Sequence, residues 1–268
     1  MKLPPAMRHL DVDLPACPRT LVRMMALLQR EDASPREMAE LVEADMALAA
    51  AVVRTVNSAM FGLLRRIESV GEALRYLGQR EVAAITFEVA LRGAFEPSPA
   101  MDRLWQQASQ AGLLMGRSAH ALGLDALHAH TAGLFARSGQ AVLLQQAPLR
   151  YEPLLAGLRH DRGALVAAEI EAFGVSHAAY GSALCAAWGL AADVVHCVRD
   201  RVLPAERWLS APRAERRLLS LGAVVDALLD EADAAECAAH LAPAADCSAD
   251  ELIGAVEPTW SRLHTALA

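Results

Sequence analysis

The sequence has few aromatic residues and no segment typical of a strand. Phe, Trp and Tyr make up 4% of the 268 residues, whereas 54% are hydrophobic, mostly alanine and aliphatic side chains. Alanine and leucine favour helices, and strands favour the aromatic and β-branched residues that are scarce here. The composition therefore argues against an all-β fold, and its high apolar content excludes intrinsic disorder.

The chain also lacks an excess of basic residues and any long apolar run. Acidic residues outnumber basic ones by 32 to 25, which gives a net charge of −7, so no overall positive field attracts a polyanion. No apolar run reaches the ~20 residues that span a bilayer, and the first residues do not resemble a signal peptide. We expect a cytoplasmic protein with neither a nucleic-acid nor a membrane partner.

Paired cysteines are missing as well. The five cysteines are scattered and form no Cys-x-x-Cys pair, whereas disulfide frameworks and zinc knuckles show close, paired spacings. We therefore expect reduced cysteines, most of them in the core.

Capping residues, prolines and glycines divide the first part of the sequence into helices. Pro18 opens a helix that should reach about Gln29, and Ser34 to Glu37 form a capping box. The remaining signals predict three more helices in this part. The first is capped by Asp45 and ends near Gly62. The second is opened by Ser69 to Glu72 and closed by Gly78, and the third runs from Arg80 to about Phe95.

Two prolines within Glu96-Pro97-Ser98-Pro99 cannot continue a helix, so we place a lobe boundary there. The helices expected beyond it run over 101–122, from an Asp125 cap to about 146, over 164–173, from a Ser176 cap to 188, over 192–202, over 212–240, and from a capping box at Ser248 to Glu251 through a kink at Pro258. The pattern predicts an all-α, two-lobed helical bundle without a significant sheet. Its parts are an N-terminal lobe (14–97), a second lobe (98–205) and a helical extension packed on them (206–268).

Several local patterns do not support a catalytic site. His128 and His130 are two residues apart, so on a helix they point in different directions, and we interpret them as solvent-facing. The glycines at 133 and 139 do not have the spacing or the lysine of a phosphate-binding loop. Ser176 and His177 are adjacent, which is no sign of a catalytic pair, and Ser176 is better interpreted as a helix cap.

The order of motifs resembles the HDOD domain family over residues 14–202. The motif Asn57-Ser58-Ala59-Met60-Phe61-Gly62 and the distant Phe173-Gly174 followed by His177 carry most of the resemblance. Leu14-Pro15, Val70 to Gly78, Ala132 to Phe135 and Trp188-Gly189 agree with it. The family-motif residues are thus Asn57, Ser58, Phe61, Gly62, Gly174 and His177.

HDOD domains are similar to HD phosphohydrolases, so the resemblance implies an HD-like second lobe. An HD enzyme holds its metal with histidines and a His-Asp dyad. In this sequence, Ala136 and Arg137 occupy the positions of the dyad, and Gln107 occupies the position of an early histidine. Asp200 and Arg201 occupy positions in the later run of histidines. Only His177 remains, and one histidine cannot hold a catalytic metal. We expect no enzyme activity, no metal and no cofactor.

The resemblance implies a bacterial signal-transduction module that acts through a protein partner, here a stand-alone one linked to motility, stress or cyclic-di-GMP pathways. A second hypothesis is that a nucleotide or cyclic dinucleotide binds in the degenerate cleft near Arg137, His177 and Trp105. Arg137 could instead pair with a carboxylate and fill that cleft. A third hypothesis is residual metal-dependent phosphohydrolase activity. The sequence does not predict the oligomeric state.

Overall fold

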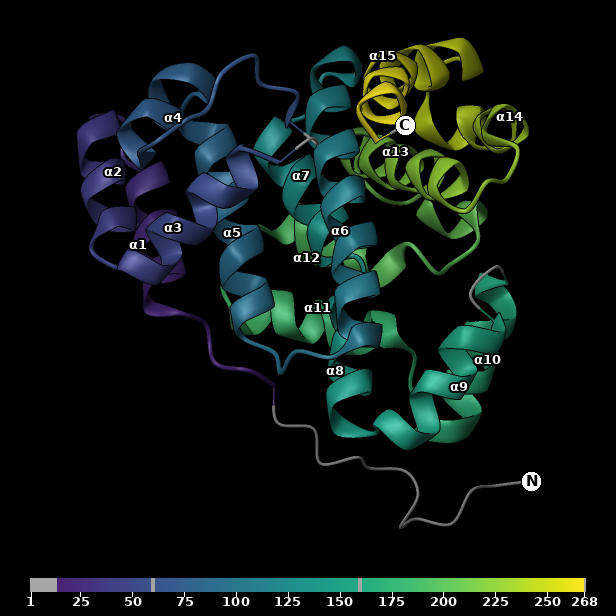
Figure 1. Cartoon of the computed structure of the whole chain (residues 1–268). Helices are drawn as coiled ribbons and strands as arrows, with labels where there is room; N and C mark the ends of the chain where they lie inside the picture. Colours follow the sequence, from purple (N-terminus) through teal and green to yellow (C-terminus); the bar gives the residue numbers. More distant parts are fainter. Residues whose placement is uncertain (1–13, 59–60, 159–160, 268) are drawn as a thin grey trace. The chain divides into compact units, whose positions relative to one another are not determined.

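The computed structural model describes residues 14–58, 61–158 and 161–267 (Figure 1). Over these ranges the regular structure is helical and there is no strand. The predicted all-α fold class is therefore confirmed. Within the same ranges, no helix has both the length and the apolarity needed to cross a bilayer.

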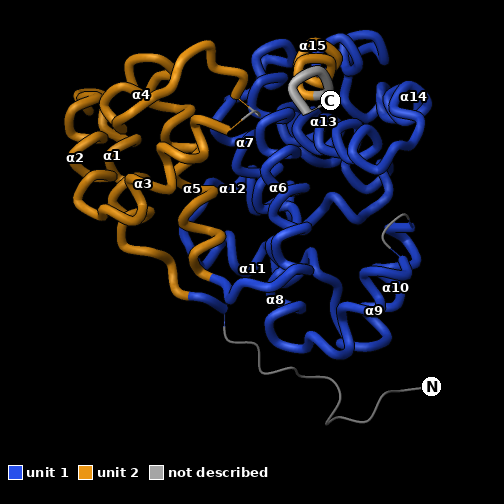
Figure 2. Tube along the Cα trace, viewed as in Figure 1, with its two compact units in different colours: residues 1–15, 95–256 blue, residues 16–94, 257–268 orange. Residues whose placement is uncertain are grey.

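The chain divides into two compact units (Figure 2). Unit 1 comprises residues 1–15 and 95–256, and unit 2 comprises residues 16–94 and 257–268. Residues 206–256, most of the helical extension that the sequence predicts to pack on the two lobes, lie in the same unit as 95–205.

Unit 2 has five helices that precede residue 95: α1 (Arg19–Leu28), α2 (Pro35–Glu43), α3 (Met46–Val56), α4 (Val70–Leu77) and α5 (Gln79–Gly93). The expected start of α2 is confirmed, since Ser34 and Glu37 form a reciprocal capping box. Asp45 caps α3 by accepting from two backbone N–H groups. Apolar residues spaced along these helices, such as Met24, Val52 and Ile85, are fully buried. Local caps and periodicity therefore explain this unit well.

The second predicted capping box in this unit is only half formed. The Ser69 hydroxyl accepts from the backbone N–H of Glu72 at 3.1 Å. The Glu72 carboxylate does not return to Ser69, because it accepts from the Glu68 N–H at 2.8 Å and pairs with Arg65 at 2.7 Å. Two competing donors thus replace the expected reciprocal bond.

Unit 1 has a larger set of helices: α6 (Pro99–Ser118), the 3-10 helix η3 (Ala119–Leu122), α7 (Ala126–Phe135), α8 (Ser138–Gln146), α9 (Pro148–Leu158), α10 (Arg162–Phe173), α11 (His177–Ala187), α12 (Ala192–Asp200), the 3-10 helix η4 (Ala205–Trp208), α13 (Arg213–Leu229), α14 (Ala234–Ala245) and the first part of α15 (Ala249–Leu267). Helices α6 and α7 lie side by side (Figure 1). Their close approach depends on glycine, since a Cβ on Gly133 would lie 2.7 Å from the Ala111 carbonyl oxygen.

Two helices that the sequence predicted as continuous are broken. The expected helix from Asp125 to Gln146 divides into α7 and α8 at Ala136 and Arg137, and the expected 212–240 helix divides into α13 and α14. At the second break Glu231 has a φ of 57°, and Asp233 caps α14. Propensity alone favours continuation at both places, so tertiary contacts decide these breaks.

The prolines of α9 and α15 do not end these helices. Helix α9 was not predicted, since no helix was expected between about residue 146 and residue 164. Pro148 begins α9 and Pro153 lies inside it. At the C-terminal end, the capping box of Ser248 and Glu251 is confirmed by reciprocal bonds of 3.1 and 2.7 Å. Helix α15 continues through Pro258.

All five cysteines are unpaired, and Cys185 and Cys197 are buried in unit 1. Burial raises the pKa of both thiols, which disfavours the reactive thiolate. These two cysteines are therefore core side chains, but Cys17, Cys237 and Cys247 are only half-buried, so the expectation that most of the cysteines lie in the core is wrong.

Candidate functional site

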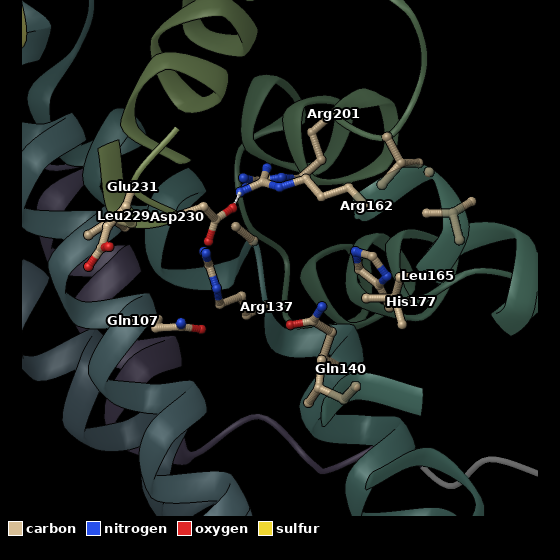
Figure 3. Close-up of a pocket in the computed structure, with 15 residues that line it drawn as sticks. Gln107, Arg137, Gln140, Arg162, Leu165, His177, Arg201, Leu229, Asp230 and Glu231 are labelled. Atoms are coloured by element: carbon tan, nitrogen blue, oxygen red, sulfur yellow. Dashed lines mark hydrogen bonds and ion pairs between the residues drawn. The ribbon is translucent and has the colours of Figure 1, made fainter. Parts of the chain in front are cut away.

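Unit 1 contains a pocket of about 450 Å³ at the two helix breaks (Figure 3). The break between α7 and α8 contributes Ala136 and Arg137, and the end of α13 contributes Asp230. Residues from α6, α8, α9, α10 and α11 complete the wall, together with Arg201 and Val202, which directly follow α12. The pocket brings together five positions that the sequence analysis had singled out: Gln107, Ala136, Arg137, His177 and Arg201.

Two other singled-out residues lie away from this pocket. Asp200 forms an ion pair with the neighbouring Arg199 at 2.7 Å. Trp105 is buried, with its ring centroid 5.3 Å from that of Phe95. Neither residue lines the pocket.

The family-motif residues before residue 95 belong to unit 2 and shape a loop there. The Asn57 side chain donates to the carbonyl oxygens of Val53 and Ile67 and accepts from the Ile67 N–H, all within 2.8 Å. Gly62 has a φ of 57°, which favours glycine. Ser58 is exposed and Phe61 is half-buried. Asn57 and Gly62 therefore stabilise the chain's path between α3 and α4.

Three arginines of the pocket share one buried aspartate. Arg137 Nη1 lies 3.2 Å from Asp226 Oδ1, and both Arg162 and Arg201 donate to Asp226 Oδ2. Arg162 also pairs with Asp230 at 2.8 Å. The Asp226 side chain is only 3% exposed. The expectation that Arg137 pairs with a nearby carboxylate is confirmed, but a cavity remains beside the pair.

The cluster carries more guanidinium groups than buried carboxylates. Burial lowers the pKa of Arg201, and the charges of Arg162 and Arg137 lower it further. The pKa of Arg137 is also lowered, by burial and then by Arg162. Buried like charges are unfavourable unless opposite charges offset them, so Asp226 is essential to this arrangement.

His177 is held from two sides by the buried carboxylate of Glu169. The His177 backbone N–H donates to Glu169 Oε2 at 2.8 Å, and Nδ1 lies 2.7 Å from the same oxygen. The Tyr151 hydroxyl donates to Glu169 Oε1 at 2.6 Å. Burial and the Glu169 charge raise the pKa of Tyr151, which keeps its hydroxyl protonated. The His177 ring is thus fixed in orientation at the pocket wall.

Ser176 occupies the cap position of α11, but its side chain makes no capping hydrogen bond. The predicted cap position of Ser176 is therefore confirmed, but the hydrogen bond expected from its hydroxyl is not formed. The carboxylate of Glu169 on α10 takes the N–H of His177 instead. Gly174, with a φ of 84°, ends α10 and allows the turn between the two helices.

Gly139 joins the two sides of the site through a backbone contact. A Cβ at Gly139 would overlap the carbonyl oxygen of His177 and lie 2.7 Å from the N of Gly181. Only glycine permits this approach of α8 to α11. The contact accounts for the break before α8, since a straight continuation of α7 is replaced by packing against α11.

His130 was expected to face solvent, and this is wrong. Its side chain is buried and lies against Gly112 and Gly116 of α6, where a Cβ on Gly116 would come within 2.9 Å of it. Burial lowers the pKa of His130 to about 4. His128 is half-buried and pairs with Asp193 at 2.8 Å. The small residues of α6 thus create a position for a neutral histidine.

The residues at the pocket do not fit a divalent metal. Over the described ranges, no three His, Cys, Asp or Glu side chains are grouped so that they could hold a metal ion. Arg137, Arg162 and Arg201 also bring fixed positive charges to the place where a cation would have to sit. His177 is close to Glu169, but two ligands leave a metal site incomplete.

Sequence reasoning missed Arg162, Asp226 and Asp230 as site residues. Arg137 and Asp226 are 89 residues apart, so no local spacing links them. The one available signal was the pair Asp226 and Asp230, four residues apart and thus on one face of a predicted helix. That face is otherwise apolar, with Val225 and Leu229 beside the two acids.

One comparison with known protein families identifies the family of this chain. The HDOD domain matches residues 14–202, and the chain belongs to the HDOD family. An HDOD domain protein of unknown function from Geobacter sulfurreducens has a similar structure, with a TM-score of 0.72, 20% identity, and coverage of 96% of this chain and 93% of that one. This likeness confirms the fold.

Two further solved structures share the fold. One is a Shewanella amazonensis SB2B protein provisionally named a phosphohydrolase, with a TM-score of 0.73, 18% identity and 95% coverage of both chains. The other is a Marinobacter aquaeolei VT8 protein provisionally named a signal transduction protein, with a TM-score of 0.65 and 22% identity, covering 94% of this chain and 60% of that one.

A curated relative from Treponema pallidum (strain Nichols), itself uncharacterised, is 25% identical over 190 residues. The match covers 70% of this chain and 37% of the relative. The chain thus spans little more than a third of that relative's length.

Proposed function

We propose that this HDOD protein is a non-catalytic regulatory module of bacterial signal transduction that acts by binding a protein partner. The observation that carries the proposal is the ion-pair cluster of Arg137, Arg162 and Arg201 around Asp226. It occupies the part of unit 1 where the resemblance to HD phosphohydrolases places a metal centre. The signal-transduction name of the Marinobacter relative is consistent with such a role.

The chemistry of the cluster argues against hydrolysis. A metal-dependent phosphohydrolase needs several imidazole or carboxylate ligands and a coordinated water of lowered pKa. Here Asp226 already neutralises guanidinium groups, and the imidazole of His177 is directed by Glu169. The side chains that remain supply hydrogen-bond donors and positive charge, which suit binding better than water activation.

A hydrolysis assay tests the first half of the proposal. The full chain is incubated with Mn²⁺, Mg²⁺, Fe²⁺ or Zn²⁺ and with p-nitrophenyl phosphate or its bis-ester, beside the matched variant His177→Ala. We expect no metal-dependent turnover and equal backgrounds for both proteins. A stoichiometric divalent ion together with turnover that His177→Ala abolishes contradicts the proposal.

Affinity capture from cells of the source organism tests the second half. The described surface carries large apolar side chains that are almost fully exposed, including Leu64 in unit 2 and Leu149 in unit 1. A partner held by such a side chain should be captured by the wild-type chain and lost with Leu64→Ser or Leu149→Ser. The absence of any specific partner, together with unchanged motility, stress and biofilm phenotypes after deletion, contradicts a partner-based role.

A further inference from the structure

A ligand-sized cavity lies directly against the arginine cluster. Its volume of about 450 Å³ falls in the range of small-molecule sites, which is about 300–1,000 Å³. All of its lining residues belong to unit 1. The cavity therefore does not depend on how the two units are placed.

One donor at this cavity is left without an acceptor. The Arg201 side chain is 10% exposed, Nη2 donates to Asp226, and Nη1 is buried without a hydrogen-bond partner in the described part of the chain. Buried polar groups are almost always paired, so this guanidinium beside the cavity is only partly compensated by Asp226. Figure 3 shows Arg201 and Arg162 together at one side of the cavity, across from Gln140.

The charges around the cavity favour an anion. Three guanidinium groups face two buried or partly buried carboxylates, Asp226 and Asp230. A third carboxylate, Glu231, also lines the cavity, but its residue is exposed to solvent, which screens its charge. The His177 ring is already paired with Glu169. The three arginines line the cavity and Asp226 does not, so the lining carries three guanidinium charges against the two carboxylates of Asp230 and Glu231.

The apolar residues of the cavity wall indicate that the anion also has an organic part. Leu155, Leu165, Val166 and Leu229 also line the cavity, and Gln107 and Gln140 add amides. The paired N–H donors of a guanidinium group match the terminal oxygens of a phosphate group, and apolar side chains bury the organic part of a ligand. Asp226 holds the three guanidinium groups in place before a ligand arrives, which reduces the side-chain conformational entropy that is lost on binding.

We propose that this cavity binds a small organic phosphate monoester, with its phosphate on Arg137, Arg162 and Arg201 and its body against the leucines. A monoester carries more negative charge and more terminal oxygens than a phosphodiester, so it fits three guanidinium groups better. The site is independent of the partner-binding role: its failure would leave that role untouched, and its success does not require a partner.

Calorimetry on the full chain tests the site with defined probes. The four ribonucleoside 5′-monophosphates and glucose 6-phosphate represent monoesters. The matching nucleosides lack the phosphate, inorganic phosphate lacks the body, and 3′,5′-cyclic AMP is a diester. We expect at least one monoester to bind at least tenfold more tightly than its nucleoside, inorganic phosphate and the diester. The proposal is overturned if no monoester gives a binding signal at millimolar concentration, or if a monoester and the diester bind with equal affinity.

Variants place the binding in this cavity. Arg201→Met removes the unpaired donor, and Val166→Trp fills the apolar side without changing a charge, so at least one informative variant should remain folded. Each variant should bind the monoester at least tenfold more weakly than the wild type does. Arg36→Met is the matched control, because Arg36 is an exposed arginine of α2 that pairs with Glu40, and it should bind as the wild type does. Unchanged binding in the folded pocket variants overturns the assignment.

Discussion

Arg137 and Asp226 lie 89 residues apart in the sequence and form a buried ion pair with Nη1 3.2 Å from Oδ1. The pair connects the break between α7 and α8 to the last turns of α13. Because Arg162 and Arg201 use the same carboxylate, one side chain holds four helical segments of unit 1 together at the pocket.

Removal of the shared carboxylate should therefore destabilise the fold strongly. Asp226→Asn leaves three guanidinium groups with only Asp230 nearby, and loss of one partner of a buried ion pair typically costs about 3–5 kcal/mol. Urea unfolding measures the change, with Glu40→Gln in the exposed pair with Arg36 as the control. The control should change little. Equal effects of the two substitutions would refute the role given to Asp226.

A methyl group at residue 139 should not be tolerated. Gly139→Ala places its Cβ on the His177 carbonyl oxygen and near Gly181 N, and backbone atoms cannot move aside as a side chain end can. We expect a loss of folding stability of at least about 3 kcal/mol, at the upper end of overpacking costs. Gly254→Ala in α15 is the control, since its Cβ meets nothing within 4 Å. That substitution should stabilise by up to about 1 kcal/mol. Thermal unfolding distinguishes the two.

His130 should make stability depend on pH below neutrality. Its pKa is about 4 in the folded protein because it is buried, against an ordinary value of 6.5. Between these values the unfolded chain binds the extra proton, so stability falls as pH is lowered from 7 toward 4. At pH 5 the loss from this group is about 2 kcal/mol.

The variant His130→Leu removes that titration. The fall in its free energy of unfolding between pH 7 and pH 5 should be smaller than that of the wild type by the same amount. The exposed His120, replaced in His120→Gln, serves as the control for the loss of a histidine from the surface. Parallel pH curves for the wild type and His130→Leu would show that His130 is not the group responsible.

The Tyr151 hydroxyl should contribute to the position of His177. Tyr151→Phe deletes the 2.6 Å bond to Glu169 Oε1 and leaves a buried carboxylate with one donor fewer. Such a loss costs about 1–3 kcal/mol. Tyr180→Phe, at a half-buried tyrosine of α11, is the matched control. The outcome that counts against this account is a Tyr151→Phe protein as stable as Tyr180→Phe.

Local signals in the sequence predicted helix starts well and helix breaks poorly. Ser34, Asp45 and Asp125 were predicted as caps and are caps, because a side chain and the N–H groups it satisfies are only two or three residues apart. The breaks at Arg137 and Glu231 depend on contacts made by distant residues. Gly139, for example, meets α11, which begins almost 40 positions later.

The site could be anticipated only in part for the same reason. The family resemblance led to Arg137, His177 and Arg201, and the structure brings all three to one pocket. The sequence did not point to Arg162, and the spacing of Asp226 and Asp230 did not show that Asp226 is the shared acceptor. Side chains that meet across 64 to 89 residues leave no periodic signature.

The contact at Gly139 also determines how the pocket can respond to an occupant. Backbone of α8 rests directly on backbone of α11, with no intervening side chain that could compress or rotate. The spacing between Arg137, two residues before Gly139, and His177, whose carbonyl makes the contact, is therefore fixed. The pocket should behave as a rigid frame, in which a rotamer change of a side chain outside the ion-pair cluster, such as Gln140, and not a hinge between helices, adapts the site to what it holds.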